Sequence, residues 1–198
     1  MKKQEQVYIN FRNVVLIIGL SVVCFALQMV FTIPFAASPF MLAFFSTGLG
    51  MIMSGTVFVL LMKKSPYRGT MLLFCLTMAL PMAVMSPLFV VFMLIGGLLG
   101  ELVFLKDRTR TTKKIMLAFS FFGIFHGIGT YMPVLFQKSA LLQELVDKNV
   151  AQAEIDAYDK LYTLPCILLV TVIAVICACI GVYIGTKIFK KHFEHIGI

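Results

Sequence analysis

The chain has 198 residues, of which 60% are hydrophobic and only 13% charged, and its mean hydropathy is +0.97. Soluble globular domains carry about 25% charged residues, so this composition indicates a membrane protein. The formal net charge is +8, but the basic residues lie in short clusters between apolar runs. That distribution is typical of membrane topology signals and argues against a nucleic-acid-binding protein. The long unbroken apolar runs favour transmembrane helices over a β-barrel, whose strands alternate in polarity.

Six apolar segments along the chain come close to the length of a membrane-spanning helix, which is about 20 residues. We expect helices over residues 14–33, 40–62, 70–85, 87–105, 115–136 and 164–189. Pro81 is expected to kink the third helix, and Pro87 suits the first turn of the fourth. The predicted fold class is an all-α membrane protein. Residues 1–198 form a single domain, a compact bundle of six transmembrane helices.

The charges between the segments predict the orientation of this bundle. Of the 17 Lys and Arg residues, 14 fall on one side, and only Lys138, Lys148 and Lys160 fall on the other. By the positive-inside rule the basic side is cytoplasmic, so both termini are expected in the cytoplasm. The one long external segment, residues 137–163, is polar and helix-prone, and the spacing of Leu141, Leu142, Leu145 and Val146 predicts an amphipathic helix over the outer face. Such a segment is either a lid or a solvated connector.

The apolar segments carry small residues at helical spacing and almost no charge. Pairs and triplets four residues apart predict close helix packing, with one face spare for another membrane protein: Ser46, Gly50 and Ser54; Gly96 and Gly100; Gly123 and Gly127; Gly181 and Gly185. Glu101 is the one Asp or Glu inside the predicted spans, and we expect it to pair near Lys106. The sequence has no zinc-protease, serine-hydrolase or nucleotide-binding motif, so we expect no enzyme activity of its own.

The C-terminal run carries the most specific pattern, G-x-x-x-G-x-K-x-x-K-K-H-F-E-x-x-G-I over residues 181–198. This ending resembles that of the MptD or Trep-Strep family of predicted substrate-binding S components of energy-coupling factor (ECF) transporters. The likeness extends to most of the chain, including the glycine-rich segment GGLLGELV, the loop start MPVLF and Leu164-Pro165 before the last helix.

The resemblance implies a multi-pass subunit of the bacterial cell membrane that captures a vitamin-like micronutrient near the outer face. It would topple in the membrane to release the substrate inside, with a transmembrane coupling protein and two cytoplasmic ABC ATPases as partners. In this superfamily the first helix presents small residues to the coupling protein, and the matching positions here are Gly19 and Ser21. Val23 departs from the second small position of that pattern.

The sequence also predicts which residues line the substrate pocket. His126 lies in the fifth segment, in FGIFHGIGTYMP, and is expected near mid-membrane with Thr130 on the same face. A buried imidazole in lipid is costly and is often functional, although it can also bond a helix carbonyl. Further candidates sit at the outer level of the bundle: Gln28, Phe35, Phe40, Met85, Tyr131, Met132, Lys138, Tyr158 and Tyr162.

These candidates describe a mostly apolar pocket without a buried ion partner, so we expect an apolar or planar ligand whose charged ends meet Lys138 or another loop lysine. A tetrapyrrole such as haem fits, with His126, Tyr131 or a methionine as iron ligand. A neutral vitamin fits as well. Apart from an iron-bearing substrate, no metal and no cofactor are expected. Two other classes remain open: a partner-independent membrane enzyme, and a structural or assembly subunit without a small-molecule ligand.

Overall fold

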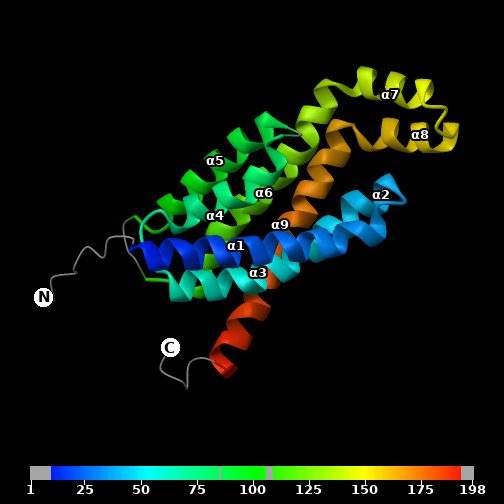
Figure 1. Ribbon diagram of the computed structural model, residues 1–198. Helices are drawn as coiled ribbons and strands as arrows, with labels where there is room; N and C mark the ends of the chain where they lie inside the picture. Colours follow the sequence, from blue (N-terminus) through cyan, green and yellow to red (C-terminus); the bar gives the residue numbers. More distant parts are fainter. Residues whose placement is uncertain (1–9, 85, 106–108, 193–198) are drawn as a thin grey trace, which may run out of the picture.

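The computed structural model describes residues 10–84, 86–105 and 109–192, and the regular structure within these ranges is entirely helical (Figure 1). Six long helices form the body: α1 (Phe11–Thr32), α3 (Thr47–Lys64), α4 (Thr70–Ala79), α5 (Pro87–Leu102), α6 (Thr112–Phe136) and α9 (Leu164–His192). Shorter segments join them: η1 (Ile33–Phe35), α2 (Pro39–Met41), the π-helical η2 (Leu42–Ser46), the 3-10 turn η3 (Leu80–Met82), α7 (Lys138–Asp147) and α8 (Gln152–Leu161).

Each of the six predicted segments contains one helix of the body, but two of these helices are shorter than a typical membrane span. Among the described residues, four continuous helical segments are long and apolar enough to cross a bilayer: Phe11–Phe35, Pro39–Lys64, Thr112–Phe136 and Leu164–His192. The other two, Thr70–Met82 and Pro87–Leu102, are shorter apolar helices. Pro81 ends α4 rather than kinking it, because proline has no N–H to donate and its ring collides with the carbonyl one turn earlier.

The six long helices form a closed ring. Going around it, α1 contacts α3, α3 contacts α9, α9 contacts α6, α6 contacts α5, and α5 contacts α4, which packs back on α1. Helices that are neighbours in the ring are therefore not always neighbours in the chain: α9, the last helix, lies between α3 and α6. This order places α6, which carries His126, between α5 and α9.

Aromatic side chains fill the middle of the ring. Phe58 of α3, Phe74 of α4 and Phe119 and Phe122 of α6 are all fully buried. The ring centroids of Phe58 and Phe119 lie 4.6 Å apart, and those of Phe74 and Phe122 lie 5.1 Å apart. Such contacts are typical of a packed aromatic core. The centre of the ring at this level is consequently solid rather than an open pore.

Glycines allow the closest helix contact, between α3 and α9. A Cβ atom at Gly181 would lie 2.4 Å from the carbonyl oxygen of Ile52, and one at Gly185 would lie 2.8 Å from the backbone of Thr56. The Thr56 hydroxyl also donates toward the Gly181 carbonyl, at 3.3 Å. The predicted small-residue face of the last helix is confirmed as a contact inside the ring, so it is not the face left spare for a partner.

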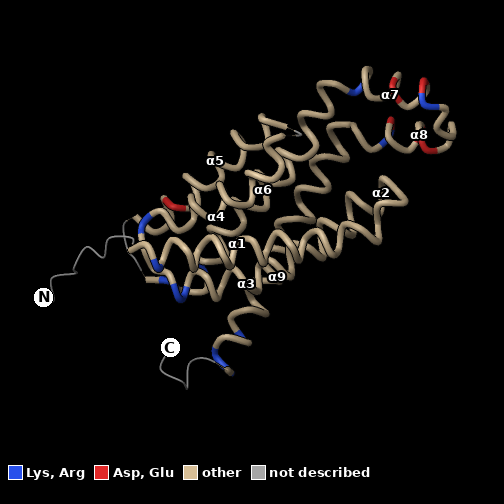
Figure 2. The backbone as a smooth tube through the Cα atoms, viewed as in Figure 1, with Lys and Arg blue, Asp and Glu red and all other residues tan. Residues whose placement is uncertain are grey.

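The two ends of the ring differ in charge (Figure 2). We call one the basic end: it holds the start of α1, the end of α3, the start of α6 and, beyond the ring, the end of α9, with Lys63, Lys64, Lys190 and Lys191. We call the other the hairpin end, because α7 and α8 pack there as an antiparallel pair. The pair carries acidic and basic residues together. The sequence predicted one amphipathic helix in this segment, and the structure has two.

Glu101 caps a helix at the basic end. One of its carboxylate oxygens accepts the backbone N–H of Gly69 at 2.8 Å, and the other accepts that of Met71 at 3.1 Å. These are donors of the first turn of α4, whose N-cap is Gly69 with a φ of 83°, a value that favours glycine. A carboxylate at a helix N-terminus is also favoured by the helix dipole. The expected partner, Lys106, lies outside the described residues.

Replacing Glu101 with alanine is expected to lower the free energy of unfolding by about 1–3 kcal/mol, because two backbone donors lose a charged acceptor. Thermal unfolding of the purified protein in detergent would measure this change. Glu154→Ala on α8 is a suitable control, since Glu154 is exposed. Equal melting temperatures for the two variants would contradict the capping role.

Candidate binding site at the hairpin end

His126 points into an aromatic environment on α6. Its ring centroid lies 5.6 Å from that of Phe89 on α5, in an edge-on arrangement, and 5.5 Å from that of Phe122, one turn away on its own helix. Phe122 belongs to the buried aromatic core. His126 thus sits directly on the hairpin side of that core, where the packed centre of the ring ends.

The imidazole of His126 has an unused polar atom. Its Nδ1 is buried and has no hydrogen-bond partner among the described residues, although the side chain as a whole is only partly buried. Leaving a buried donor or acceptor unpaired costs about 1–3 kcal/mol, so such atoms in folded proteins usually call for an explanation. Nδ1 therefore does not bond to a helix carbonyl, which was the alternative role expected for His126. A ligand atom would satisfy it.

Two glycines that follow His126 let neighbouring helices approach α6. A Cβ atom at Gly127 would lie 2.9 Å from the Thr171 hydroxyl of α9, and one at Gly129 would lie 3.0 Å from Phe92 of α5. Thr130 follows His126 on the helix, but its exposed hydroxyl donates back to the His126 carbonyl at 2.7 Å. The glycines therefore provide room for helix packing, and Thr130 satisfies the backbone.

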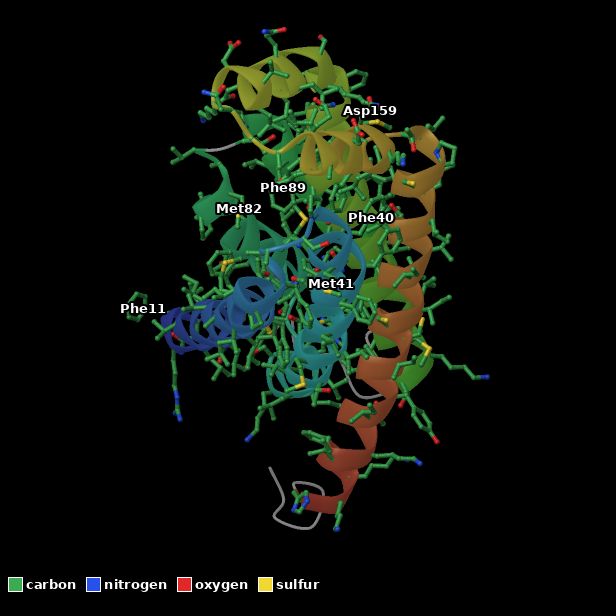
Figure 3. The ribbon with its side chains drawn as sticks, turned by 90° about the vertical axis from the view of Figure 1, so that its right-hand side faces the viewer. Phe11, Phe40, Met41, Met82, Phe89 and Asp159 are labelled. Atoms are coloured by element: carbon green, nitrogen blue, oxygen red, sulfur yellow. The ribbon has the colours of Figure 1, made fainter. Side chains whose placement is uncertain are left out.

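Tyrosines from α6 and from α8 with its C-cap meet nearer the hairpin. Tyr131 is 8% exposed, and its hydroxyl lies 3.5 Å from that of Thr47 on α3. Its ring is 6.4 Å from that of Tyr162, which stacks on Tyr158 at 6.0 Å. Tyr131 also belongs to an apolar cluster with Phe40 and Phe44 at its edge. Figure 3 looks onto this end, with Met82 and Phe89 on one side and Phe40 on the other.

The hydroxyls of Tyr158 and Tyr162 remain neutral at physiological pH. Burial raises the pKa of Tyr162 to about 12, and the proximity of Tyr131 and Tyr158 adds to that rise. Burial likewise raises the pKa of Tyr158, together with the nearby charge of Glu154. Neutral phenols donate and accept hydrogen bonds and offer flat apolar faces. This group suits a planar ligand that carries polar edges.

Lys138 ties the two helices of the hairpin together. Its Nζ lies 2.9 Å from an Asp159 carboxylate oxygen and donates to the Asp159 carbonyl at 2.6 Å. The ammonium side chain is 23% exposed and the carboxylate side chain 57%. The expectation that Lys138 meets a charged end of the ligand is a prediction, and the structure shows this residue engaged within the hairpin.

Lys138→Met should loosen the hairpin more than Asp159→Asn does, because only the former removes both the ion pair and the bond to the backbone carbonyl. Exposed ion pairs contribute about 0–1 kcal/mol, so the melting temperature should change little in either variant. Amide hydrogen exchange over residues 138–161 would measure the loosening. Equal exchange in the two variants would show that the carbonyl contact adds nothing.

The remaining predicted pocket residues lie on several different helices. Gln28 is 8% exposed and faces α3, where a Cβ atom at Gly50 would lie 3.2 Å from its side chain. Met132 is partly buried, and Phe35 stacks against Phe45 at 6.0 Å. Met85 lies outside the described residues. Gln28, Met132 and Phe35 do not form one contiguous set with His126 and the tyrosines.

The predicted partner contacts on α1 differ in exposure. Gly19 is exposed, and a Cβ atom there would meet no neighbour within 4 Å. Ser21 is fully buried, and its hydroxyl donates to the Ile17 carbonyl at 2.7 Å. Of the two, only Gly19 lies on the surface of the ring. Val22 and Val23 are exposed beside it, at 53% and 47%.

A cleft of about 520 Å³ also opens at the hairpin end. Its walls come from the start of α5, the end of α6 and one face of α7: Ser86, Pro87, Leu88, Pro133, Val134, Phe136, Gln137, Ala140, Leu141 and Glu144. None of the predicted site residues that the structure describes lines it. The cleft could not be found from the sequence, because three separate segments build it. The contact of Phe89 with His126 was missed for the same reason, since it joins two helices. The only local signal is the sequence Ser86-Pro87, which marks the start of α5.

The ring, its charge-poor helices and the four long apolar segments define an all-helical integral membrane protein. Residues 11–195 match the family described as "Hypothetical bacterial integral membrane protein (Trep_Strep)". The chain belongs to this family, as its C-terminal pattern predicted. No curated protein and no solved structure matches the chain.

Proposed function

We propose that this chain is the substrate-capturing S component of an ECF-type ABC importer. It binds a largely apolar, planar micronutrient, either a tetrapyrrole such as haem or a neutral vitamin, at the hairpin end of the ring. The observation that carries the binding role is the unpartnered, buried Nδ1 of His126 between Phe89 and Phe122. The importer class rests on the resemblance of the C-terminal run and of the loop ends to predicted S components.

The site favours a ligand with flat apolar surface and few polar atoms. Phe89 and Phe122 flank His126, and Tyr131, Tyr158 and Tyr162 lie toward the hairpin. Most small-molecule sites combine an apolar wall with a few placed polar groups in this way. His126 gives the ligand a hydrogen bond or, for haem, an axial ligand to iron.

The proposed topology has six spans, with the basic end in the cytoplasm. Segments Thr70–Met82 and Pro87–Leu102 are shorter than a full span, but they pack on each other within the closed ring. The hydrophobic thickness of about 30 Å corresponds to about 20 helical residues, so the bilayer thins or the connecting turns enter it at these two helices. The lysines at the basic end follow the positive-inside rule.

The proposed partners are a transmembrane coupling protein and two ABC ATPases, which would supply the energy for transport. The exposed apolar face of α1 around Gly19, Val22 and Val23 is the proposed contact with the coupling protein. The absence of a side chain at Gly19 lets a second helix approach α1 closely. Ser21, buried under this face, would support the contact through the backbone of α1 rather than touch the partner.

Co-expression of the full chain with an ECF coupling protein and its two ATPases tests the proposal. A stable four-part complex that retains a small molecule is the expected result, and Gly19→Leu should weaken its assembly without affecting ligand retention. Failure to associate would refute the S-component role. Turnover by the isolated chain would instead indicate an enzyme, and a complex without any ligand would indicate an assembly subunit.

A further inference from the structure

The cleft at the hairpin end carries a second inference, which is independent of the proposed transport but takes its leaflet from the proposed orientation, with the basic end in the cytoplasm. We propose that it binds the amine-bearing head group of an outer-leaflet phospholipid, of the phosphatidylethanolamine class, with an acyl chain lying along its apolar wall. The argument rests on the size of the cleft, its position, its lining and its charge.

The volume and lining of the cleft suit an amphiphile. At about 520 Å³ it falls within the range of about 300–1,000 Å³ that is usual for small-molecule sites. Its walls are mainly apolar, with prolines at positions 87 and 133 and aliphatic or aromatic side chains beside them. Three polar side chains, those of Ser86, Gln137 and Glu144, complete the lining. An acyl chain matches the apolar wall, and a polar head group matches the three polar side chains.

The position of the cleft places it where lipid meets water. One wall is the start of α5, an apolar helix, and the other is α7, a helix with no buried residue in the hairpin. Leu88 is 40% exposed and Phe136 is 73% exposed at its rim. Exposed apolar side chains next to a polar helix are typical of the membrane interface. A ligand entering from the lipid side would therefore meet the apolar rim first.

The charge of the lining selects an amine over an anionic head group. Glu144 is the one formally charged side chain among the residues that line the cleft. It shares a face of α7 with Gln137 and Ala140, which lie seven and four residues earlier in the sequence. Its carboxylate pairs with Lys148, one turn further along the helix, and both side chains are more than half exposed. Such an exposed pair contributes only about 0.3–0.5 kcal/mol, so a lipid ammonium can displace Lys148 at small cost.

Lipid titration of the delipidated full chain in detergent, followed by native mass spectrometry, tests the proposal. Palmitoyl-oleoyl phosphatidylethanolamine should bind more tightly than phosphatidylglycerol with the same acyl chains. Glu144→Gln should weaken ethanolamine-lipid binding about twofold, because the carboxylate is exposed and an exposed ion pair contributes little. Lys148→Met should strengthen it, since the competing ammonium is gone. Ala140→Trp should block binding by filling the cleft, and Glu154→Gln on α8 should have no effect.

Several outcomes would overturn the proposal. Equal or tighter binding of phosphatidylglycerol would exclude selection by Glu144. Unchanged binding in both Glu144→Gln and Ala140→Trp would place the lipid elsewhere. Soluble phosphoethanolamine that competes fully with the lipid would show a site for a free head group rather than a membrane lipid. Glu144→Gln changes one exposed side chain without altering its shape, so it tests the idea even if Ala140→Trp fails to fold.

Discussion

Gly181→Ala is expected to destabilise the protein by about 1–3 kcal/mol or more, which makes it the most damaging single-methyl change in the ring. The added Cβ would lie 2.4 Å from the Ile52 carbonyl oxygen and 2.9 Å from the Met51 carbonyl oxygen. Both obstacles are backbone atoms of α3, so no side-chain rotation relieves the collision. The helices α3 and α9 must separate, and the Thr56 bond to the Gly181 carbonyl must lengthen.

Gly19→Ala is the matched control, because it adds the same methyl group to an exposed position of α1 where nothing lies within 4 Å. Alanine is a better helix former than glycine by about 0.5–1 kcal/mol, so this variant should be slightly more stable than the wild type. Thermal unfolding in one detergent compares the two variants directly. Similar changes of the same sign would contradict the close contact of α3 with α9.

His126→Phe is expected to remove ligand binding while keeping or raising the stability of the ligand-free protein. Phenylalanine retains a planar ring against Phe89 and Phe122 and removes the buried Nδ1, whose lack of a partner costs about 1–3 kcal/mol. Binding should weaken about tenfold to a hundredfold if the ligand bonds to this nitrogen. A gain in stability with a loss of function is typical of binding residues.

Haemin is the first probe for this comparison. For a haem substrate, the wild type should shift the Soret band of haemin and gain thermal stability, and His126→Phe should do neither. The same thermal-shift assay with a panel of neutral planar vitamins tests the other substrate class. Leu117→Met, at an exposed position of the same helix, is a control that leaves the imidazole in place. A lower melting temperature for ligand-free His126→Phe would instead assign the histidine a structural role.

Part of the candidate site was predictable because it depends on local chemistry. An imidazole in an apolar run is visible in the sequence, and so are tyrosines at the ends of such runs. Their partners were not predictable. Phe89 reaches His126 from another helix, and Lys138 bonds to Asp159 across the hairpin. Glu101 is likewise visible in the sequence as a charge inside an apolar segment. Its role in capping α4, however, depends on where Gly69 lies in space.

The sequence by itself determined the membrane class, the six apolar helical segments and their approximate bounds, and the family. These follow from composition, hydropathy and a short C-terminal pattern, which are properties of the chain read in order. Only the tertiary structure decided the ring order, the use of Gly181 and Gly185 inside it, the burial of Ser21, and the cleft beside Glu144. In a bilayer nearly every face of a helix is apolar, so hydropathy cannot distinguish a face that packs on another helix from one that meets lipid.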